Sequence, residues 1–446
     1  MGVCRMPVGV KNYFRKIERK LLILVSIYTL LGAGVLYMLG LAPSLNVIII
    51  GALITVFTFW ALNYYWSLMD YRGDPFLFPL VALFASTSLI FLCRLNPIYA
   101  ARQFVWLMGG LLVLLTMTRL LTNYWVLAHY KYIYALAGIV GLVLPIFFGV
   151  EQGGAKSWLD LGFFSLQTSE FVKILLVLFL ASFLTENRLL LTEGTRTVMG
   201  VGLPTIREWG PLVIMWGVSL ILLIFQKDLG TGLIYFSTFL FMVYASTGRA
   251  SYVLIGGLMF LTGAGASYSF FHHVRMRVEI WLDPWQHIET YGYQVAQSLF
   301  AIAAGGIAGA GIGAGLPRYI PAVHTDFIFA AITEELGLAG GIALIIMYII
   351  FVYRGFVIAL QAGDDFSSLL AVGITSLMGL QSFIILAGVT KMLPLTGVTL
   401  PFISYGGSSL VANFIILALL LNISHANNTI REERPAPALE SELQAV

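Results

Sequence analysis

Asp326 is the residue of this chain whose position most clearly suggests chemistry. It lies in the segment 316–330, where a polar stretch leads into a long apolar run, and Glu334 and Glu335 follow inside that run. A carboxylate can accept a proton or hold a cation. Ionisable side chains at membrane depth are costly and are retained for a task. Asp326 is therefore the first candidate for a functional residue, provided that the chain lies in a membrane.

Two further segments combine cations with tryptophan. Lys156, Ser157 and Trp158 stand together, and Arg275 and Arg277 shortly precede another Trp-rich stretch. A cation beside Trp158 could bind a lipid pyrophosphate and a sugar ring, and the planar guanidinium fork of arginine suits phosphate better than lysine does. Ordinary anchoring at a membrane interface explains both segments as well.

Other polar residues fit structural roles. Glu170 and Lys173 are spaced to pair on one helix face. Asp228, in the tight turn that begins at Gln226, can cap the next helix. The segment 394–409 is dense in Pro, Gly and hydroxyl residues, which suits either a simple outer loop or an irregular cavity wall. Its candidates are Pro401, Ser404, Tyr405, Gly406 and Gly407.

Composition identifies the setting. Of the 446 residues, 59% are hydrophobic and 11% are charged, and a soluble domain would carry about a quarter charged residues. The mean hydropathy is +0.90. We therefore expect an all-α, polytopic transmembrane bundle. The net charge of +3 is too small to suggest nucleic acid. Cys4 and Cys93 give no disulfide framework and are expected near opposite membrane faces.

Hydropathy predicts about twelve spans. They lie near 21–41, 46–66, 76–93, 104–124, 131–150, 170–186, 209–226, 229–247, 251–270, 327–353, 368–391 and 408–424. Residues 1–20 form a basic N-terminus that fits a cytoplasmic signal anchor better than a cleaved signal peptide. With that orientation most Lys and Arg residues lie inside, as the positive-inside rule requires. Both termini are then cytoplasmic, and residues 425–446 form a disordered tail.

The longest outer segment, 271–325, is too long to be a mere connector. Within it, residues 291–300 have apolar positions at helical spacing, which favours a helix lying on the membrane surface. Gly309, Gly311, Gly313 and Gly315 suggest a flexible backbone that folds over a site.

Five segments together resemble the SEDS family of peptidoglycan glycosyltransferases, RodA, FtsW and SpoVE. They are AKSWLDLG…LQTSEFVK, QKDLGTGLI, RVEIWLDPW…GYQVAQSLFAIAAGG, YIPAVHTDFIFAAITEELGLAG and LPLTGVTLPFISYGGSS, in the family's order. The resemblance implies a ten-helix catalytic core at 76–424, preceded by two additional spans at 21–75. Thr168 and Lys227 depart from the proline that is common there.

The resemblance also implies the reaction. Lipid II, a disaccharide-peptide on undecaprenyl pyrophosphate, would be polymerised into β-1,4 glycan strands with inversion, at the outer face of the bacterial cytoplasmic membrane. Asp326 matches the family's essential aspartate and is assigned as the base. A divalent cation, Mg²⁺ or Mn²⁺, would be shared between Asp326 and substrate, and the expected partners are membrane lipid and a class B penicillin-binding protein, without nucleic acid.

The remaining site predictions follow from these motifs. The expected substrate-binding residues are Lys156, Ser157, Trp158, Arg275, Arg277, Gln294, Gln297, Ser298, Arg318, His324, Thr325, Ser404 and Tyr405. The expected supporting residues are Glu170, Lys173, Gln226, Asp228, Glu334, Glu335, Pro401, Gly406 and Gly407.

Two other functions stay open at this point. A flippase for the lipid-linked precursor would suit twelve spans and the intramembrane Glu334 and Glu335. A scaffold that only recruits partners would tolerate the loss of Asp326.

Overall fold

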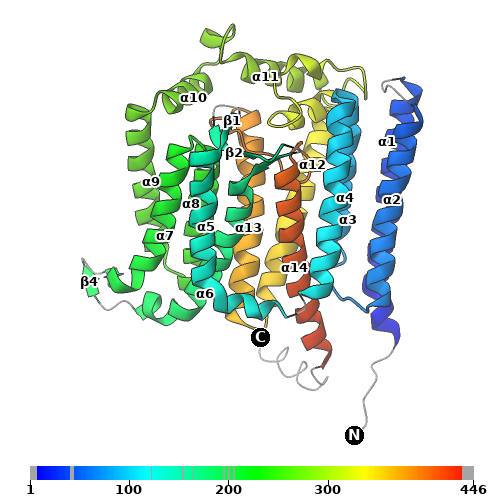
Figure 1. The fold of residues 1–446 in the computed structure, drawn as a ribbon. Helices are drawn as coiled ribbons and strands as arrows, with labels where there is room; N and C mark the ends of the chain where they lie inside the picture. Colours follow the sequence, from blue (N-terminus) through cyan, green and yellow to red (C-terminus); the bar gives the residue numbers. More distant parts are fainter. Residues whose placement is uncertain are drawn as a thin grey trace.

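The computed structural model describes residues 8–40, 45–121, 123–152, 155–162, 164–193, 196–198, 201–203 and 206–433. It is a bundle of long helices with short strands at two of its turns (Figure 1). Eleven helices of the described chain are long and apolar enough to cross a membrane. A further helix, α7, coincides with the predicted span 209–226. The predicted all-α membrane fold is confirmed.

The helices follow the apolar runs of the sequence. They are α1 (Val8–Met38), α2 (Leu45–Leu68), α3 (Leu77–Leu95), α4 (Pro97–Leu120), α5 (Lys131–Phe148), α6 (Thr168–Glu193), α7 (Ile206–Phe225), α8 (Leu229–Thr247), α9 (Ala250–Phe270), α10 (His272–Leu282), α11 (Tyr293–Gly305), α12 (Ile328–Leu360), α13 (Asp365–Val389) and α14 (Gly407–Glu433). Short 3-10 helices are η1 (Tyr124–Tyr130), η2 (Trp285–His287) and η3 (Pro317–Tyr319). The strands are β1 (Val150–Gln152), β2 (Ala155–Asp160), β3 (Ser165–Gln167), β4 (Arg196–Val198) and β5 (Val201–Leu203).

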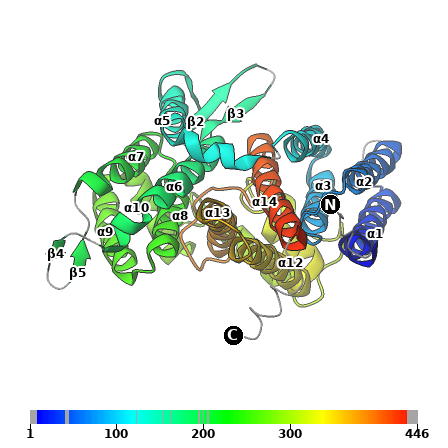
Figure 2. The ribbon, with the colours of Figure 1, turned by 90° about the horizontal axis from the view of Figure 1, so that it is seen from below.

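The central helices of the bundle are α6, α8, α13 and α14. Seen along the bundle, α9 lies at one edge and α1 and α2 lie at the opposite edge (Figure 2). Helices α10 and α11 and the antiparallel sheet β1–β2–β3 cover one end, which we call the loop face (Figure 1). Helix α1 begins, and α14 ends, at the opposite end of the bundle. The predicted helix within 291–300 is confirmed: it is α11, and it packs on α12. Its location on the membrane surface stays a prediction.

Both predicted terminal segments are more helical than expected. Helix α1 already begins at Val8, inside the basic segment 1–20. The prediction of a disordered tail from 425 is wrong for residues 425–433, which continue α14. Side chains hold this extension in place: His425 Nδ1 accepts a bond from Arg72 N, and Asn428 Nδ2 donates to Arg72 O at 2.7 Å. The rest of the predicted tail, and Cys4, lie outside the described residues.

The glycine-rich segment has a different role from the predicted one. Gly337 breaks α12 with φ 70° and ψ −179°, and an added Cβ there would lie 2.3 Å from Gly309 N. Ala310 N and Gly311 N donate to the carbonyl oxygens of Glu334 and Glu335. The segment is therefore fixed against the break in α12 and does not fold over the main cavity.

Glu334 and Glu335 complete this junction. Glu334 Oε1 accepts from Leu316 N at 2.7 Å, and Glu335 Oε1 pairs with Arg94 Nε at 3.1 Å. Arg94 Nη2 also donates to the carbonyl oxygens of Gly313 and Gly315. Both acids thus join α12 to α3 and to the segment before η3, which fits the supporting role predicted for them.

Replacing Arg94 by Ala should destabilise the protein strongly, because Glu335 is fully buried and would lose its cation. Breaking a largely buried ion pair costs about 3 kcal/mol, and we expect a clearly lower melting temperature in detergent. Arg188→Ala is the matched control, since Arg188 pairs with Asp365 at an exposed site and such pairs contribute roughly 0–1 kcal/mol. Equal melting temperatures for the two variants would contradict this assignment.

Candidate active site

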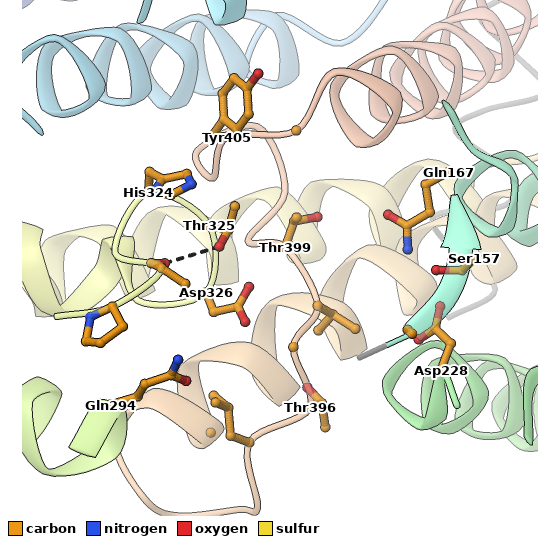
Figure 3. A pocket seen from close by; sticks show the side chains of 18 of the residues that line it. Ser157, Gln167, Asp228, Gln294, His324, Thr325, Asp326, Thr396, Thr399 and Tyr405 are labelled. Atoms are coloured by element: carbon orange, nitrogen blue, oxygen red, sulfur yellow. Dashed lines mark hydrogen bonds between the residues drawn. The ribbon is translucent and has the colours of Figure 1, made fainter. Parts of the chain in front are cut away.

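A large cavity opens at the loop face of the bundle, with a volume of about 1370 Å³. Its walls come from α4, the β2–β3 hairpin, the start of α8, α10, α11, the segment before α12 and the segment 393–407. Figure 3 shows the side chains that face it. Segments far apart in the sequence therefore meet around one polar space.

Asp326 points into this cavity from the turn that precedes α12 (Figure 3). Thr325 N and Asp326 N both donate to Ala322 O, and Ala322 has φ 53°. The next residue, Phe327, is fully buried and fixes the entry into the helix. The turn therefore presents the carboxylate to the cavity from a rigid support.

Burial decides the acidity of this carboxyl group. A helix N-terminus favours the charged form, while removal from water disfavours it. Asp326 keeps partial access to the cavity, yet the surrounding protein raises its pKa to about 6, against lowering contributions from Thr325 and Arg277. The carboxylate is thus ionised at neutral pH and is basic enough to accept a proton from an alcohol in a transition state.

Arg277 provides the nearest positive charge. Its Nη1 donates to Thr396 O at 3.2 Å. A Cβ added at Gly397 would lie 3.7 Å from Asp326 Oδ2 and 3.9 Å from Arg277 Nη2, so the two charged groups flank Gly397. Burial lowers the pKa of Arg277, and Asp228 and Asp326 raise it. The guanidinium therefore interacts electrostatically with both carboxylates.

Asp228 both caps a helix and lines the cavity. It caps α8, accepting from Thr231 N at 3.2 Å and from Thr231 Oγ1 at 2.9 Å. It also lines the cavity on the side away from Asp326 (Figure 3). Burial raises the pKa of Asp228, and its bonds with Thr231 oppose that shift.

The segment 394–409 forms a wall of the cavity, as one of the two interpretations held. Its apolar residues Leu400, Phe402 and Ile403 are buried, while Thr396 and Thr399 face the cavity. A buried polar cluster supports it from α6, α13 and α14. Lys173 Nζ contacts Glu170 Oε2 at 2.5 Å and Gln381 Oε1 at 3.0 Å, and Gln381 Nε2 donates to Thr399 O at 2.9 Å.

Aromatic stacking holds another part of the wall. The His324 ring stacks on Tyr99 at 4.3 Å between centroids, and Tyr405 packs against both rings. Tyr405 N donates to His324 O at 2.8 Å. Burial lowers the pKa of His324, so the ring is neutral at physiological pH. This geometry favours a structural role for His324 over proton transfer.

The cavity collects about half of the predicted site residues. Besides Asp326, the predicted residues that line it are Ser157, Trp158, Glu170, Asp228, Arg277, Gln294, His324, Thr325, Tyr405, Gly406 and Gly407. The predicted residues that do not line it are Lys156, Lys173, Gln226, Arg275, Gln297, Ser298, Arg318, Glu334, Glu335, Pro401 and Ser404.

Two predicted pyrophosphate ligands therefore need correction. Lys156 is exposed and its Nζ donates to Ile146 O at 2.9 Å, away from the cavity. Arg275 is also exposed, donates to Ser269 O and lies over the Tyr268 ring. Arg318 likewise lies over the Tyr319 ring outside the cavity. Ser298 and Ser404 are buried and bond to Val389 O and Thr325 O.

Three cations that the sequence analysis did not select as site residues also line the cavity. They are Arg102 on α4, Lys227 in the turn before α8, and Lys391 after α13. Lys227 was noted only as a departure from proline, and Arg102 and Lys391 stand near the predicted span ends. Their predicted location on the same membrane side was the available signal. Together with Arg277 they place four cations around the cavity, beside the carboxylates of Asp160, Glu170, Asp228 and Asp326. Guanidinium and ammonium groups of this kind can bind phosphate.

The fold and this cavity define a polytopic membrane protein whose cavity is lined by four cations and four carboxylates, with Asp326 pointing into it. Comparison with known proteins places the chain further. It belongs to the FtsW, RodA and SpoVE family described as "Cell cycle protein", whose model matches residues 74–429.

Relatives and solved structures agree. The chain is 42% identical to "Peptidoglycan glycosyltransferase RodA" of Mycobacterium leprae, over 81% of this chain and 80% of that protein. It is 34% identical to "Probable peptidoglycan glycosyltransferase FtsW" of Bacillus subtilis, over 81% and 91%. A solved chain described as "Structural coordination of polymerization and crosslinking by a peptidoglycan synthase complex" matches with a TM-score of 0.67 and 28% identity, over 80% and 98%. A crystal structure of Thermus thermophilus RodA matches with a TM-score of 0.56 and 26% identity, over 80% and 97%.

Proposed function

We propose that this protein is a peptidoglycan glycosyltransferase that polymerises lipid II into β-1,4 glycan strands. Its relatives carry that activity in their names. The observation that carries the proposal is the Asp326 carboxylate, with a pKa of about 6, facing a cavity lined by four cationic side chains. A base and a cluster of cations are what transfer of a sugar from pyrophosphate to an alcohol requires.

In the proposed reaction Asp326 accepts the proton of the acceptor 4-hydroxyl. The acceptor oxygen forms a bond to the anomeric carbon of the donor sugar, and the bond from that carbon to the pyrophosphate oxygen breaks. The α-linked donor thereby gives a β-link. Arg277 stands beside Asp326, and together with Arg102, Lys227 and Lys391 it would stabilise the negative charge that develops on the leaving pyrophosphate.

We place the loop face outside the cell and both termini in the cytoplasm. The distribution of Lys and Arg along the sequence supports this orientation by the positive-inside rule. The cavity would then open at the outer face of the cytoplasmic membrane, where the assembled precursor is used.

A divalent cation would have to be shared with the substrate. Among the described residues, no group of three His, Cys, Asp or Glu side chains could hold a metal ion. Mg²⁺ is commonly bound through one or two carboxylates together with substrate phosphates, and Asp326 and a pyrophosphate would fit that pattern. The cation would add positive charge at the leaving group.

A class B penicillin-binding protein is the proposed partner. The likeness to a chain of a peptidoglycan synthase complex supports an assembly of this kind. The flippase interpretation gains no support from Glu334 and Glu335, because both bind groups of the junction at α12.

The deciding experiment is polymerisation by the purified protein with lipid II, with and without the partner transpeptidase. We expect glycan strands that a muramidase digests. Translocation of labelled lipid II in liposomes without strand formation would refute the proposal.

A further inference from the structure

Helices α1 and α2 lie outside the segment that the family model matches, which begins at residue 74. Helix α1 packs on α2 and α3. Helix α2 reaches α4 through two side-chain bonds, Thr58 Oγ1 to Met108 Sδ at 3.7 Å and Trp66 Nε1 to Thr118 Oγ1 at 3.2 Å. The two additional helices thus extend the bundle beside α4, the helix whose other end lines the active-site cavity (Figure 2).

An apolar groove lies between α2 and α4, with a volume of about 290 Å³. Each helix contributes one face, with residues at i, i+3, i+4 and i+7. They are Thr58, Ala61, Leu62 and Tyr65 from α2, and Met108, Leu111, Leu112 and Leu115 from α4. The Trp66–Thr118 bond joins the residue after Tyr65 on α2 to a residue about one turn beyond Leu115 on α4, and it closes that end. The groove is therefore a pocket for an apolar chain, open toward the cavity side of α4.

One stripe of α4 connects the groove with the cavity. Val105 lines the cavity and Leu112 lines the groove. Residues seven apart lie on nearly the same helix face, separated by about 10 Å along the axis. Both side chains are open, at 68% and 60% exposure. Between them is Gly109, where an added Cβ would meet nothing within 4 Å. An apolar chain can therefore run from the cavity mouth over Gly109 into the groove.

We propose that this groove holds the polyprenyl tail of a lipid-linked substrate whose pyrophosphate lies in the cavity. This inference rests on the proposed function, because the substrate proposed there joins a pyrophosphate head to a long apolar tail. The continuity of Val105, Gly109 and Leu112 favours a tail that continues from a head group held in the cavity. The extra N-terminal helices thereby gain a role in substrate retention.

The groove is expected to increase the affinity for the substrate only moderately. Lipid tails are as apolar as the groove, so binding gains from packing and from an ordered tail, not from removal of apolar surface from water. Single interactions between membrane-embedded groups are modest, so we expect a change in affinity of about threefold to tenfold. A groove of this kind would matter most for holding the substrate through successive additions.

Ala61→Phe tests the groove, because Ala61 is exposed on α2 and a phenyl ring there fills the space. Gly51→Phe is the matched control on the same helix, outside the groove and without neighbours within 4 Å. Lipid II with its full tail is compared with an analogue carrying a short prenyl tail. For Ala61→Phe, the ratio of kcat/KM between long and short tails should fall about threefold to tenfold, with shorter strands. Gly51→Phe should keep the wild-type ratio.

A second variant and a binding readout make the result decisive. Gly109→Leu obstructs the stripe and has open space for its side chain, so it should lower the same ratio even if Ala61→Phe folds poorly. Equal ratios for these variants and Gly51→Phe would overturn the proposal. This holds even if Ala61→Phe copurifies with less phospholipid than wild type, because the groove would then hold bulk lipid. Equilibrium binding of long and short polyprenyl pyrophosphates separates the two proposals. Tail-dependent binding that Ala61→Phe weakens, without any strand formation by wild type, would refute the glycosyltransferase function and keep the groove.

Discussion

Replacing Asp326 by Asn is expected to reduce lipid II polymerisation at pH 7.5 by about 10² to 10⁴-fold, the contribution typical of a positioned general base. Asparagine keeps the size of the side chain and its place in the turn before α12, but it cannot accept the proton of the sugar hydroxyl. Strand formation from purified lipid II measures the effect. A wild-type rate for Asp326→Asn would show that this carboxylate is not the base.

The pH dependence provides a second test of the same residue. Burial raises the pKa of Asp326 to about 6. A base must be deprotonated, so the wild-type rate should rise tenfold per pH unit below about 6 and level off above it. The pH–rate profile of the residual activity of Asp326→Asn should lack this rise below about pH 6. If the rate of the variant rises over the same pH range as that of wild type, the titrating group is not Asp326.

As the pH rises, the contribution of Asp326 to the free energy of unfolding should fall while the activity rises. The folded state holds the proton of Asp326 more tightly than the unfolded chain does, because burial raises the pKa of this carboxyl group above the ordinary value for aspartate. This stabilisation is therefore complete below about pH 4 and is lost as the pH rises through about 6. At pH 8 the ionised carboxyl group opposes folding, and Asp326→Asn removes that cost. Its melting temperature should equal or exceed that of wild type, which excludes misfolding as the cause of inactivity.

The sequence was sufficient for the membrane-spanning helices, and it selected Asp326, which lines the cavity. Apolar runs of membrane-spanning length predict the helices, because each must satisfy its own backbone bonds in lipid. Asp326 stood out because a charged residue at the start of an apolar run has few structural explanations. The helix cap formed by Asp228 could also be predicted from the sequence, since its partner Thr231 is three residues away.

Contacts between distant segments were beyond the sequence pattern. Lys156 and Trp158 stand in one strand, yet Trp158 lines the cavity and Lys156 does not. The pairing of Arg94 with Glu335 joins residues 241 positions apart. The four cations of the cavity likewise come from two helices, α4 and α10, and two connecting segments. Local periodicity fixes which face of an element a residue occupies, while only packing decides what that face meets.

Arg277 is the cation for which we expect the largest effect, because it flanks Gly397 together with Asp326 and interacts electrostatically with Asp228 and Asp326. Arg277→Ala should lower kcat by about 10² to 10³-fold, the usual cost of removing one donor that stabilises developing negative charge. Arg277→Lys should recover only part of the rate, since an ammonium group lacks the planar fork. Arg275→Ala is the matched control, two residues earlier on α10 and outside the cavity, and should stay close to wild type.

The acidity of Asp326 distinguishes a direct electrostatic role of Arg277 from a structural one. Arg277 lowers the pKa of Asp326. Its removal should therefore shift the acid limb of the pH–rate profile to higher pH, and Arg277→Lys should shift it less. A variant that merely loosened the bond to Thr396 O would lose rate at every pH with the limb unmoved. An unshifted limb in Arg277→Ala would thus place the guanidinium outside the field of the base and assign leaving-group stabilisation to Arg102, Lys227 or Lys391.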